Sequence, residues 1–134
     1  MHTLNLPKKI ARPLDVYSFF DLQTQIHALE ARDEQIASKT LLKTNDLRIV
    51  LTVLRNGAKM HEHRADARIS IHLLRGAVQF SVGENSWELG ANSLIPLEPS
   101  VVHTIEALES SALLMTMAWP TGNTLRLIPH RGYS

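Results

Sequence analysis

The chain has 134 residues, of which 44% are hydrophobic and 20% charged, with 6 Gly and 6 Pro. This composition is typical of one globular domain and excludes disordered, collagen-like and low-complexity chains. Lys and Arg number 14 against 13 Asp and Glu, which gives a net charge of +1. Such a balanced charge does not indicate binding to nucleic acid or to an anionic membrane. Cysteine is absent, which excludes disulfides, thiolate zinc sites and cysteine nucleophiles. The 7 His are the enriched residue type, and each can titrate or bind a metal ion near neutral pH.

The sequence contains no recognisable targeting segment. Its N-terminal residues lack the continuous apolar stretch of a signal peptide, and it has no run of about 18 apolar residues, the length needed to cross a bilayer. We therefore expect a cytoplasmic protein with no nucleic-acid partner and no membrane partner.

The N-terminal part predicts an irregular arm over residues 1–20, followed by one amphipathic helix over 21–34. Asp21 is expected to cap the helix, because its carboxylate can accept backbone N–H groups of the first turn. Apolar residues then recur at helical spacing, with Ile36 extending the pattern.

After Thr40 the chain changes to short apolar runs, each closed by a turn signal such as Asn56-Gly57 or Arg75-Gly76. The runs are Thr40–Leu42, Leu47–Leu54, Lys59–His63, Ile69–Leu74, Ala77–Val82, Ser86–Leu89, Leu94–Leu97, Val102–Ala107 and Ala112–Ala118. Such regular spacing predicts an all-β sandwich or barrel. We divide the chain into an arm and helix packing on the barrel (1–39), the barrel (40–119) and a C-terminal tail (120–134).

Alternation along the strands predicts which residues face the core. The inward set is predicted to be Ile69, Ile71, Leu73, Val78 and Phe80. His72 then faces outward, where an interface or surface role is the leading interpretation. We expect the strands on either side of Arg75-Gly76 to pair as a tight hairpin.

His61 and His63 form a His-x-His pair on a predicted strand. Residues two apart on a strand share a face, so both imidazoles can reach one metal ion. His103 is the candidate third ligand, because it shares a face with the apolar Ile105. Two alternatives stay open: His103 as a hydrogen-bonded core residue, and the pair as an ordinary feature of a strand edge.

The stretches GAKMHEHRADARISIHLLRGAVQFSV and WELGANSLIPLEPSVVHTIEALE resemble the two motifs of the cupin superfamily. The first motif, with a turn glycine, His-x-His and a strand ending at a glycine turn, matches Gly57, His61, His63 and Gly76. The second motif matches ANSLIPLEPSVVH, ending at His103. Asn92 takes the place of the turn glycine, and Asn enters the left-handed region comparatively readily. The resemblance covers about residues 47–118.

The resemblance implies a cupin jelly-roll barrel with a metal centre inside it. His61, His63 and His103 match three ligand places of the family, but the Glu place falls on Ile69, or on Arg68 if the register slips by one. Asp66 lies in a nearby loop. The Asn that often follows the second-motif His is replaced by Ala107. Because cupins carry out many unrelated reactions, the resemblance favours a fold more than an activity.

Three function classes follow from these observations. The first is a protein binding divalent Fe, Ni, Zn or Mn through His61, His63 and His103, acting as an oxygenase or as a metal-assisted isomerase or hydrolase. Its substrate pocket would be lined by Ile69, Ile71, Leu73, Val78 and Phe80, which suits a small hydrophobic or aromatic molecule. The second is a metal-free barrel binding a small ligand as a sensor or carrier. The third is a structural barrel used for dimerisation, and in each case we expect a homodimer.

Overall fold

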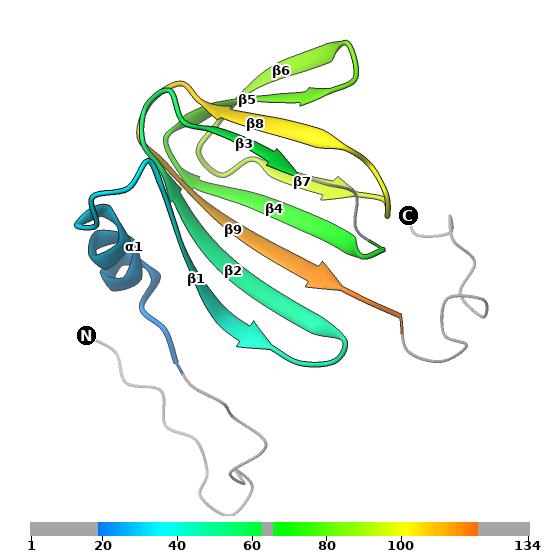
Figure 1. Cartoon of the computed structure of the whole chain (residues 1–134), viewed down its shortest axis with the longest axis horizontal. Helices are drawn as coiled ribbons and strands as arrows, with labels where there is room; N and C mark the ends of the chain where they lie inside the picture. The colour runs from blue at the N-terminus through cyan, green and yellow to red at the C-terminus, as the bar shows by residue number, and fades with distance from the viewer. Residues whose placement is uncertain (1–18, 63–65, 121–134) are drawn as a thin grey trace, which may run out of the picture.

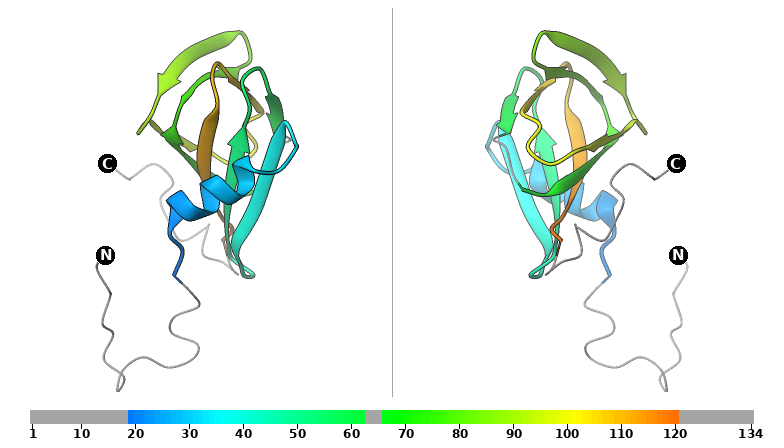
Figure 2. Two further views of the ribbon diagram at one scale, coloured as in Figure 1. Left: turned by 90° about the vertical axis from the view of Figure 1, so that its left-hand side faces the viewer. Right: turned by 90° about the vertical axis from the view of Figure 1, so that its right-hand side faces the viewer.

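The computed structural model describes residues 19–62 and 66–120, with one helix and nine strands in these ranges (Figure 1). The elements are α1 (Leu22–Glu30), β1 (Ile36–Lys43), β2 (Leu47–Leu54), β3 (Lys59–Glu62), β4 (Arg68–Arg75), β5 (Ala77–Val82), β6 (Asn85–Gly90), β7 (Leu94–Leu97), β8 (His103–Ala107) and β9 (Ser111–Ala118). They form a five-stranded sheet in the order β1-β2-β9-β4-β7 and a four-stranded sheet in the order β3-β8-β5-β6. The two antiparallel sheets face each other (Figure 2), as the predicted jelly-roll requires.

The helix starts where the sequence predicts and ends earlier. Asp21 is the N-cap, and its Oδ1 accepts a backbone N–H of the first turn at 3.1 Å. The helix ends at Glu30, so the prediction of a helix over 21–34 is wrong at its C-terminal end. Ile36 belongs to β1, where its Cα partner is Leu54, because pairing with β2 competes with continuation of the helix.

The predicted hairpin across Arg75-Gly76 is not formed. Strand β4 pairs with β7 and β9, whereas β5 pairs with β6 and β8 in the other sheet. The turn at Gly76 therefore carries the chain from one sheet to the other. Gly76 has φ +95°, and a Cβ added there would lie 2.3 Å from the Ser111 hydroxyl oxygen, so this crossing requires glycine.

The space between the sheets is filled by the predicted inward residues. Their exposed fractions are at most 8%: Ile69 8%, Ile71 0%, Leu73 0%, Val78 1% and Phe80 5%. They belong to one packed cluster, with contributions from β2, β8 and β9. The alternation in β4 and β5 therefore predicts the faces correctly, although the two sets meet across the interior rather than within a hairpin.

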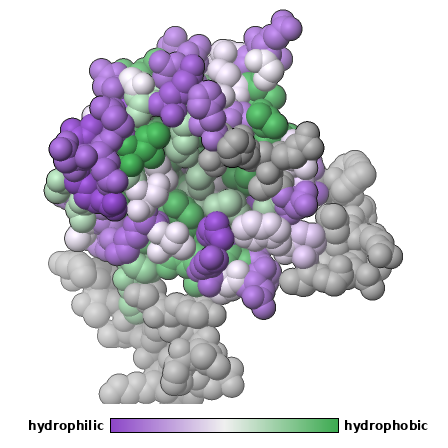
Figure 3. Space-filling view, in the orientation of Figure 1, coloured by the Kyte–Doolittle hydropathy of each residue, from purple (hydrophilic) through white to green (hydrophobic). Residues whose placement is uncertain are grey.

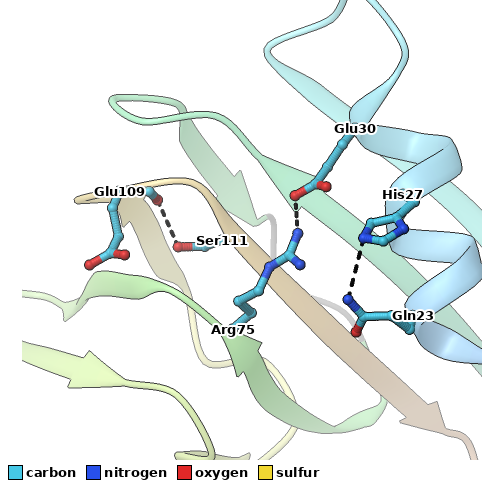
Figure 4. Close-up of polar contacts among 6 residues, drawn as sticks. All are labelled: Gln23, His27, Glu30, Arg75, Glu109 and Ser111. Carbon is cyan, nitrogen blue, oxygen red and sulfur yellow. Dashed lines mark hydrogen bonds and ion pairs between the residues drawn. The ribbon is translucent and has the colours of Figure 1, made fainter.

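A second apolar cluster lies on the outer face of the five-stranded sheet. Ile26 and Leu29 of α1 are 3% and 5% exposed and pack against Leu51 and Val53 of β2. An ion pair between Glu30 of α1 and Arg75 at the end of β4 also links this helix to the sheet (Figure 4). The helix thus stabilises the outside of the barrel and contributes nothing to its interior.

The barrel has two ends that differ in which strands begin and finish there. At the Gly76 end, β2, β4 and β8 finish while β5 and β9 begin. At the His103 end, β2, β4 and β8 begin, and β3 and β9 finish, as the partners Arg68↔Ala118 and Glu62↔His103 show. Figure 1 shows these strand ends along the right-hand side of the molecule, from β8 above to β2 below.

Candidate functional site

His103 is the predicted site residue that lies in the interior. It begins β8 and is 2% exposed, on the same face as Ile105 at 0%. Its ring packs on Phe80 with centroids 5.6 Å apart, and its Nδ1 lies 3.3 Å from the carbonyl oxygen of Val101. The prediction that His103 shares the inward face with Ile105 is confirmed.

The two nitrogens of His103 have different surroundings. A carbonyl oxygen has no proton to give, so Nδ1 donates in its contact with Val101. In the neutral ring, Nε2 is then a hydrogen-bond acceptor. Nε2 is fully buried and has no hydrogen-bond partner among the described residues. The interior therefore holds an unused lone pair on a histidine whose other nitrogen is fixed by the backbone.

His61 lies on the other side of the same sheet. Its Cα partner in β8 is Thr104, whereas the partner of His103 is Glu62. Directly opposed residues share a face and successive residues alternate, so His61 and His103 point to opposite faces. His61 is exposed to solvent. The structure therefore does not bring these two histidines together, and His63 lies outside the described residues.

The described residues do not fit a three-histidine metal centre. Among the side chains that the structure describes, there is no group of three or more from His, Cys, Asp and Glu able to hold one ion. Ile69, at the place of the family glutamate, is 8% exposed within the apolar core, and Asp66 is exposed. Of the residues predicted to bind metal, His103 alone is described in the interior.

The predicted pocket residues divide between packed core and cavity wall. Ile71, Leu73 and Val78 are at most 1% exposed and fill the space between the sheets. Ile69 lines a cavity of about 480 Å³ bounded by β4, β7 and β9. Phe80 lines a second cavity of about 420 Å³ between the β5-β6 hairpin and β7.

The 420 Å³ cavity lies beside His103. Two of its lining residues, Phe80 and Val101, are the residues that contact the His103 ring. The lining is apolar throughout and consists of Phe80, Val82, Trp87, Leu89, Leu94, Ile95, Pro96, Leu97 and Val101. Trp87 and Leu94 at its rim are 49% and 62% exposed. A solvent-open apolar space of small-molecule size thus lies next to a buried imidazole that does not itself line it.

The sequence interpretation missed Arg48, a charged residue in the otherwise apolar start of β2. Its Cα partner is Met117, whose partner in β4 is the inward-facing Ile69, so Arg48 belongs to an inner-face row. Its Nε is buried with no hydrogen-bond partner among the described residues, and its guanidinium carbon lies 5.8 Å from the Trp119 ring centroid. The alternation Arg48, Val50, Thr52 and Leu54 was a sequence signal for this inward position.

The space-filling view shows hydrophobic surface in the middle of the face seen in Figure 1, bordered by hydrophilic residues (Figure 3).

No described helix is both long and apolar enough to cross a bilayer.

No protein-family model and no curated protein matches the sequence. Solved structures do match the fold. A conserved protein of unknown function from Streptococcus pyogenes has a TM-score of 0.68 at 19% identity, covering 80% of this chain and 91% of its own. A cupin superfamily protein from Desulfitobacterium hafniense has a TM-score of 0.66 at 18% identity, covering 90% and 100%.

A mutant of salicylate 1,2-dioxygenase from Pseudoaminobacter salicylatoxidans has a TM-score of 0.60 at 14% identity, covering 71% of this chain and 31% of that enzyme. Cupin proteins recur among the similar structures. The chain therefore has the cupin jelly-roll fold, which leaves the activity open because cupin barrels differ in their interior residues.

Proposed function

We propose that this protein binds a small molecule at the open side of its cupin barrel, between the β5-β6 hairpin and β7, with His103 as the polar contact beneath it. The observation that carries the proposal is the buried, unpartnered Nε2 of His103 beside an apolar cavity of about 420 Å³. A buried polar atom without a partner costs about 1–3 kcal/mol. A ligand that donates a hydrogen bond to Nε2 removes this cost in the bound state.

The cavity supports the same proposal through its size and lining. Small-molecule sites occupy roughly 300–1,000 Å³ and are mostly apolar with a few polar groups. Here the rings of Phe80 and Trp87 lie 6.0 Å apart and line one wall. An aromatic ligand with a hydroxyl or N–H group meets both requirements.

The test measures binding of phenol, benzamide and hydroxybenzoates by the shift in thermal midpoint. A ligand at about 100 times its dissociation constant stabilises the folded state by about 2.7 kcal/mol. His103→Leu should abolish the shift, while His27→Leu should leave it unchanged, because His27 is exposed on α1, which does not line the 420 Å³ cavity. If no compound in the panel shifts the wild type, the proposal is wrong.

A metal centre is the second candidate, and the His103 geometry favours it specifically. Histidines that bind metal usually donate their other N–H to a backbone carbonyl or a carboxylate, as Nδ1 does here toward Val101. Further ligands would have to come from outside the described residues, where His63 lies. This candidate includes the oxygenase and the isomerase or hydrolase activities with Fe, Ni, Zn or Mn.

Elemental analysis of protein purified without a histidine tag separates the two candidates. A metal centre predicts near-stoichiometric metal that His103→Leu removes. His61→Leu is the matched control, because the outward position of His61 predicts that its loss leaves the metal in place. Metal-free protein after reconstitution with Fe, Ni, Zn and Mn would rule out this candidate and leave the small-molecule proposal untouched.

The homodimer and the cytoplasmic location stay predictions. The sequence places His72 and Leu74 on a partly apolar outer face. Leu74 packs against the cluster under α1, so the helix already covers part of this face. Light scattering tests the homodimer, and a monomeric mass would contradict it.

A further inference from the structure

The outer face of the five-stranded sheet carries an apolar cavity next to the surface that α1 covers. The helix contacts β1 and β2, and β7 forms the opposite edge of the sheet (Figure 1). The apolar cluster under α1 includes Leu114 of β9. The next residue of β9 on the same face, Thr116, lines the cavity of about 480 Å³, which we call the outer hollow. The outer hollow therefore continues the apolar face that α1 covers only in part.

The floor of the outer hollow is built from small side chains that point away from the core. Ser70 pairs with Pro96 of β7 and with Thr116 of β9, so these three residues form one row across the sheet. Ile69 and Ile71, on either side of Ser70 in β4, are 8% and 0% exposed in the interior. Alternation therefore places the row on the outer face. Because its side chains are short, the row leaves space that larger apolar side chains can fill.

The chain itself supplies a segment that starts beside this space. Strand β9 ends at Ala118, which lines the outer hollow, and the described residues end at Pro120. Residues 121–134 follow and contain Leu125, Leu127 and Ile128. An extended chain of seven residues spans roughly 23–25 Å, so the stretch from 119 to 125 is long enough to return to the hollow. Residues 1–18 instead precede α1, on the side of the sheet formed by β1 and β2.

Carboxylates border the outer hollow where β9 ends. Glu98 lines the hollow with its side chain 62% exposed and forms an ion pair of 2.9 Å with Arg68. Asp66 is exposed two residues before β4 begins, at the same end of the sheet. Asp46 is also exposed, and its backbone oxygen accepts the N–H of Trp119, directly after β9.

The charge of the C-terminal segment complements this border. Residues 121–134 contain Arg126 and Arg131 and neither Asp nor Glu. Exposed opposite charges attract weakly, so they favour the approach of this segment, whereas burial of its leucines supplies most of the binding free energy.

We infer that residues 125–128, Leu-Arg-Leu-Ile, bind in the outer hollow of their own chain. Leu125 and Leu127 are two residues apart, so both side chains enter the hollow when the segment is extended, with Arg126 directed toward solvent. The bound segment extends the apolar cover that α1 begins. The inference does not depend on the proposed function, because no ligand beside His103 is needed for it.

Disulfide trapping tests the contact directly, because the chain has no Cys of its own. The double variant Thr116→Cys/Leu127→Cys should form a disulfide within one chain under mild oxidation, detected by mass spectrometry and non-reducing electrophoresis. Ser81→Cys/Leu127→Cys is the matched control. Ser81 is half-buried like Thr116 but lies on the outer face of the other sheet, since its neighbour Phe80 is in the core.

The bound segment should raise the rate of disulfide formation for the Thr116 pair by about tenfold or more over the control pair, because it raises the local concentration of the two thiols. Equal rates for the two pairs would overturn the inference. Disulfides formed mainly between two chains would also overturn it, because they would place the segment on a second copy.

A second measurement uses the thermal midpoint of variants without new cysteines. Leu127→Asp should lower the midpoint by about 4 °C or more, because the charge removes one leucine from an apolar site. Asn123→Asp is the matched control, since it adds the same charge without loss of an apolar side chain, and it should change the midpoint by less than about 1 °C. Equal midpoints for Leu127→Asp and the wild type would contradict the inference. A decrease seen only at high protein concentration would contradict it as well, because it would indicate contact between copies.

Discussion

The two ends of the barrel differ in how their polar groups are satisfied. At the Gly76 end, the Ser111 hydroxyl accepts the backbone N–H of Ala77 at 3.1 Å. The same hydroxyl donates to the carbonyl oxygen of Glu109 at 2.8 Å (Figure 4). At the His103 end, Nε2 of His103 and Nε of Arg48 are buried without partners among the described residues.

We interpret this difference as a separation of stability from the proposed ligand binding within one small barrel. Unsatisfied buried polar atoms are rare in folded proteins, because each one costs free energy that packing elsewhere must offset. The Gly76 end, with Leu54 and Leu73 fully buried, contributes such packing. We therefore expect substitutions at the Gly76 end to lower stability, and substitutions of the unpartnered groups at the His103 end to affect binding instead.

The largest effect is expected for Gly76→Ala. The new Cβ would lie 2.3 Å from the Ser111 hydroxyl oxygen and 2.4 Å from the backbone oxygen of Ser110, at φ +95°. The left-handed conformation alone costs an L-residue about 1–2 kcal/mol, and the contact with backbone adds a further 1–3 kcal/mol, so we expect a loss of about 2–5 kcal/mol. Urea unfolding measures it as a lower midpoint at constant slope.

Gly83→Ala is the control for this prediction. Gly83 also has a positive φ, +59°, but nothing lies within 4 Å of an added Cβ. Its substitution should cost only the conformational part, about 1–2 kcal/mol. Equal losses at both glycines would show that the close approach to Ser111 is not what restricts position 76.

A smaller loss is expected for Ser111→Ala. Ser111 is 1% exposed, and removing its hydroxyl leaves the Ala77 N–H at the start of β5 without its acceptor. The expected cost is about 1–3 kcal/mol in urea unfolding. Ser81→Ala is the control, because its hydroxyl bonds to Ser86 in an exposed position, and there a change within about 0.5 kcal/mol is expected. A cost at Ser111 no greater than at Ser81 would contradict the expectation that the buried hydrogen bonds at the Gly76 end contribute to stability.

The sequence predicts most of the barrel because local patterns determine it. Period-two alternation identifies the inward faces of β4 and β5, and the left-handed turn expected at Asn92 has φ 71°. Sheet membership has no local signal. The turn at Gly76 is equally compatible with a hairpin and with a crossing between sheets, and only long-range pairing of β4 with β9 decides between them.

The site is less predictable, because strand register decides which histidines meet. The inward position of His103 follows from its spacing to Ile105. The outward position of His61 depends on its alignment with Thr104, and a shift of one residue would reverse it. Arg48 was missed because an arginine in a strand usually faces solvent, and its inward direction follows from the pairing with Met117.

The smallest effect on stability is expected for His103→Leu, and its sign distinguishes the two interpretations of this histidine. A histidine kept for core packing and hydrogen bonding would cost several kcal/mol when replaced. Here the substitution exchanges a ring with one unpartnered nitrogen, and one contact of 3.3 Å to Val101, for an apolar side chain beside Phe80. Loss of the contact and removal of the unpartnered atom offset each other, so the unliganded protein should change by less than about 1 kcal/mol.

Ile105→Val in the same strand is the matched control for His103→Leu. Ile105 is 0% exposed, and loss of one methylene there should cost about 0.5–1.5 kcal/mol, which shows that this part of the core responds to packing changes. Urea unfolding of the ligand-free protein measures both variants. A loss above about 2 kcal/mol for His103→Leu would assign the histidine to the core. Unchanged stability together with lost binding would show that the His103 end retains an unpartnered imidazole for its ligand.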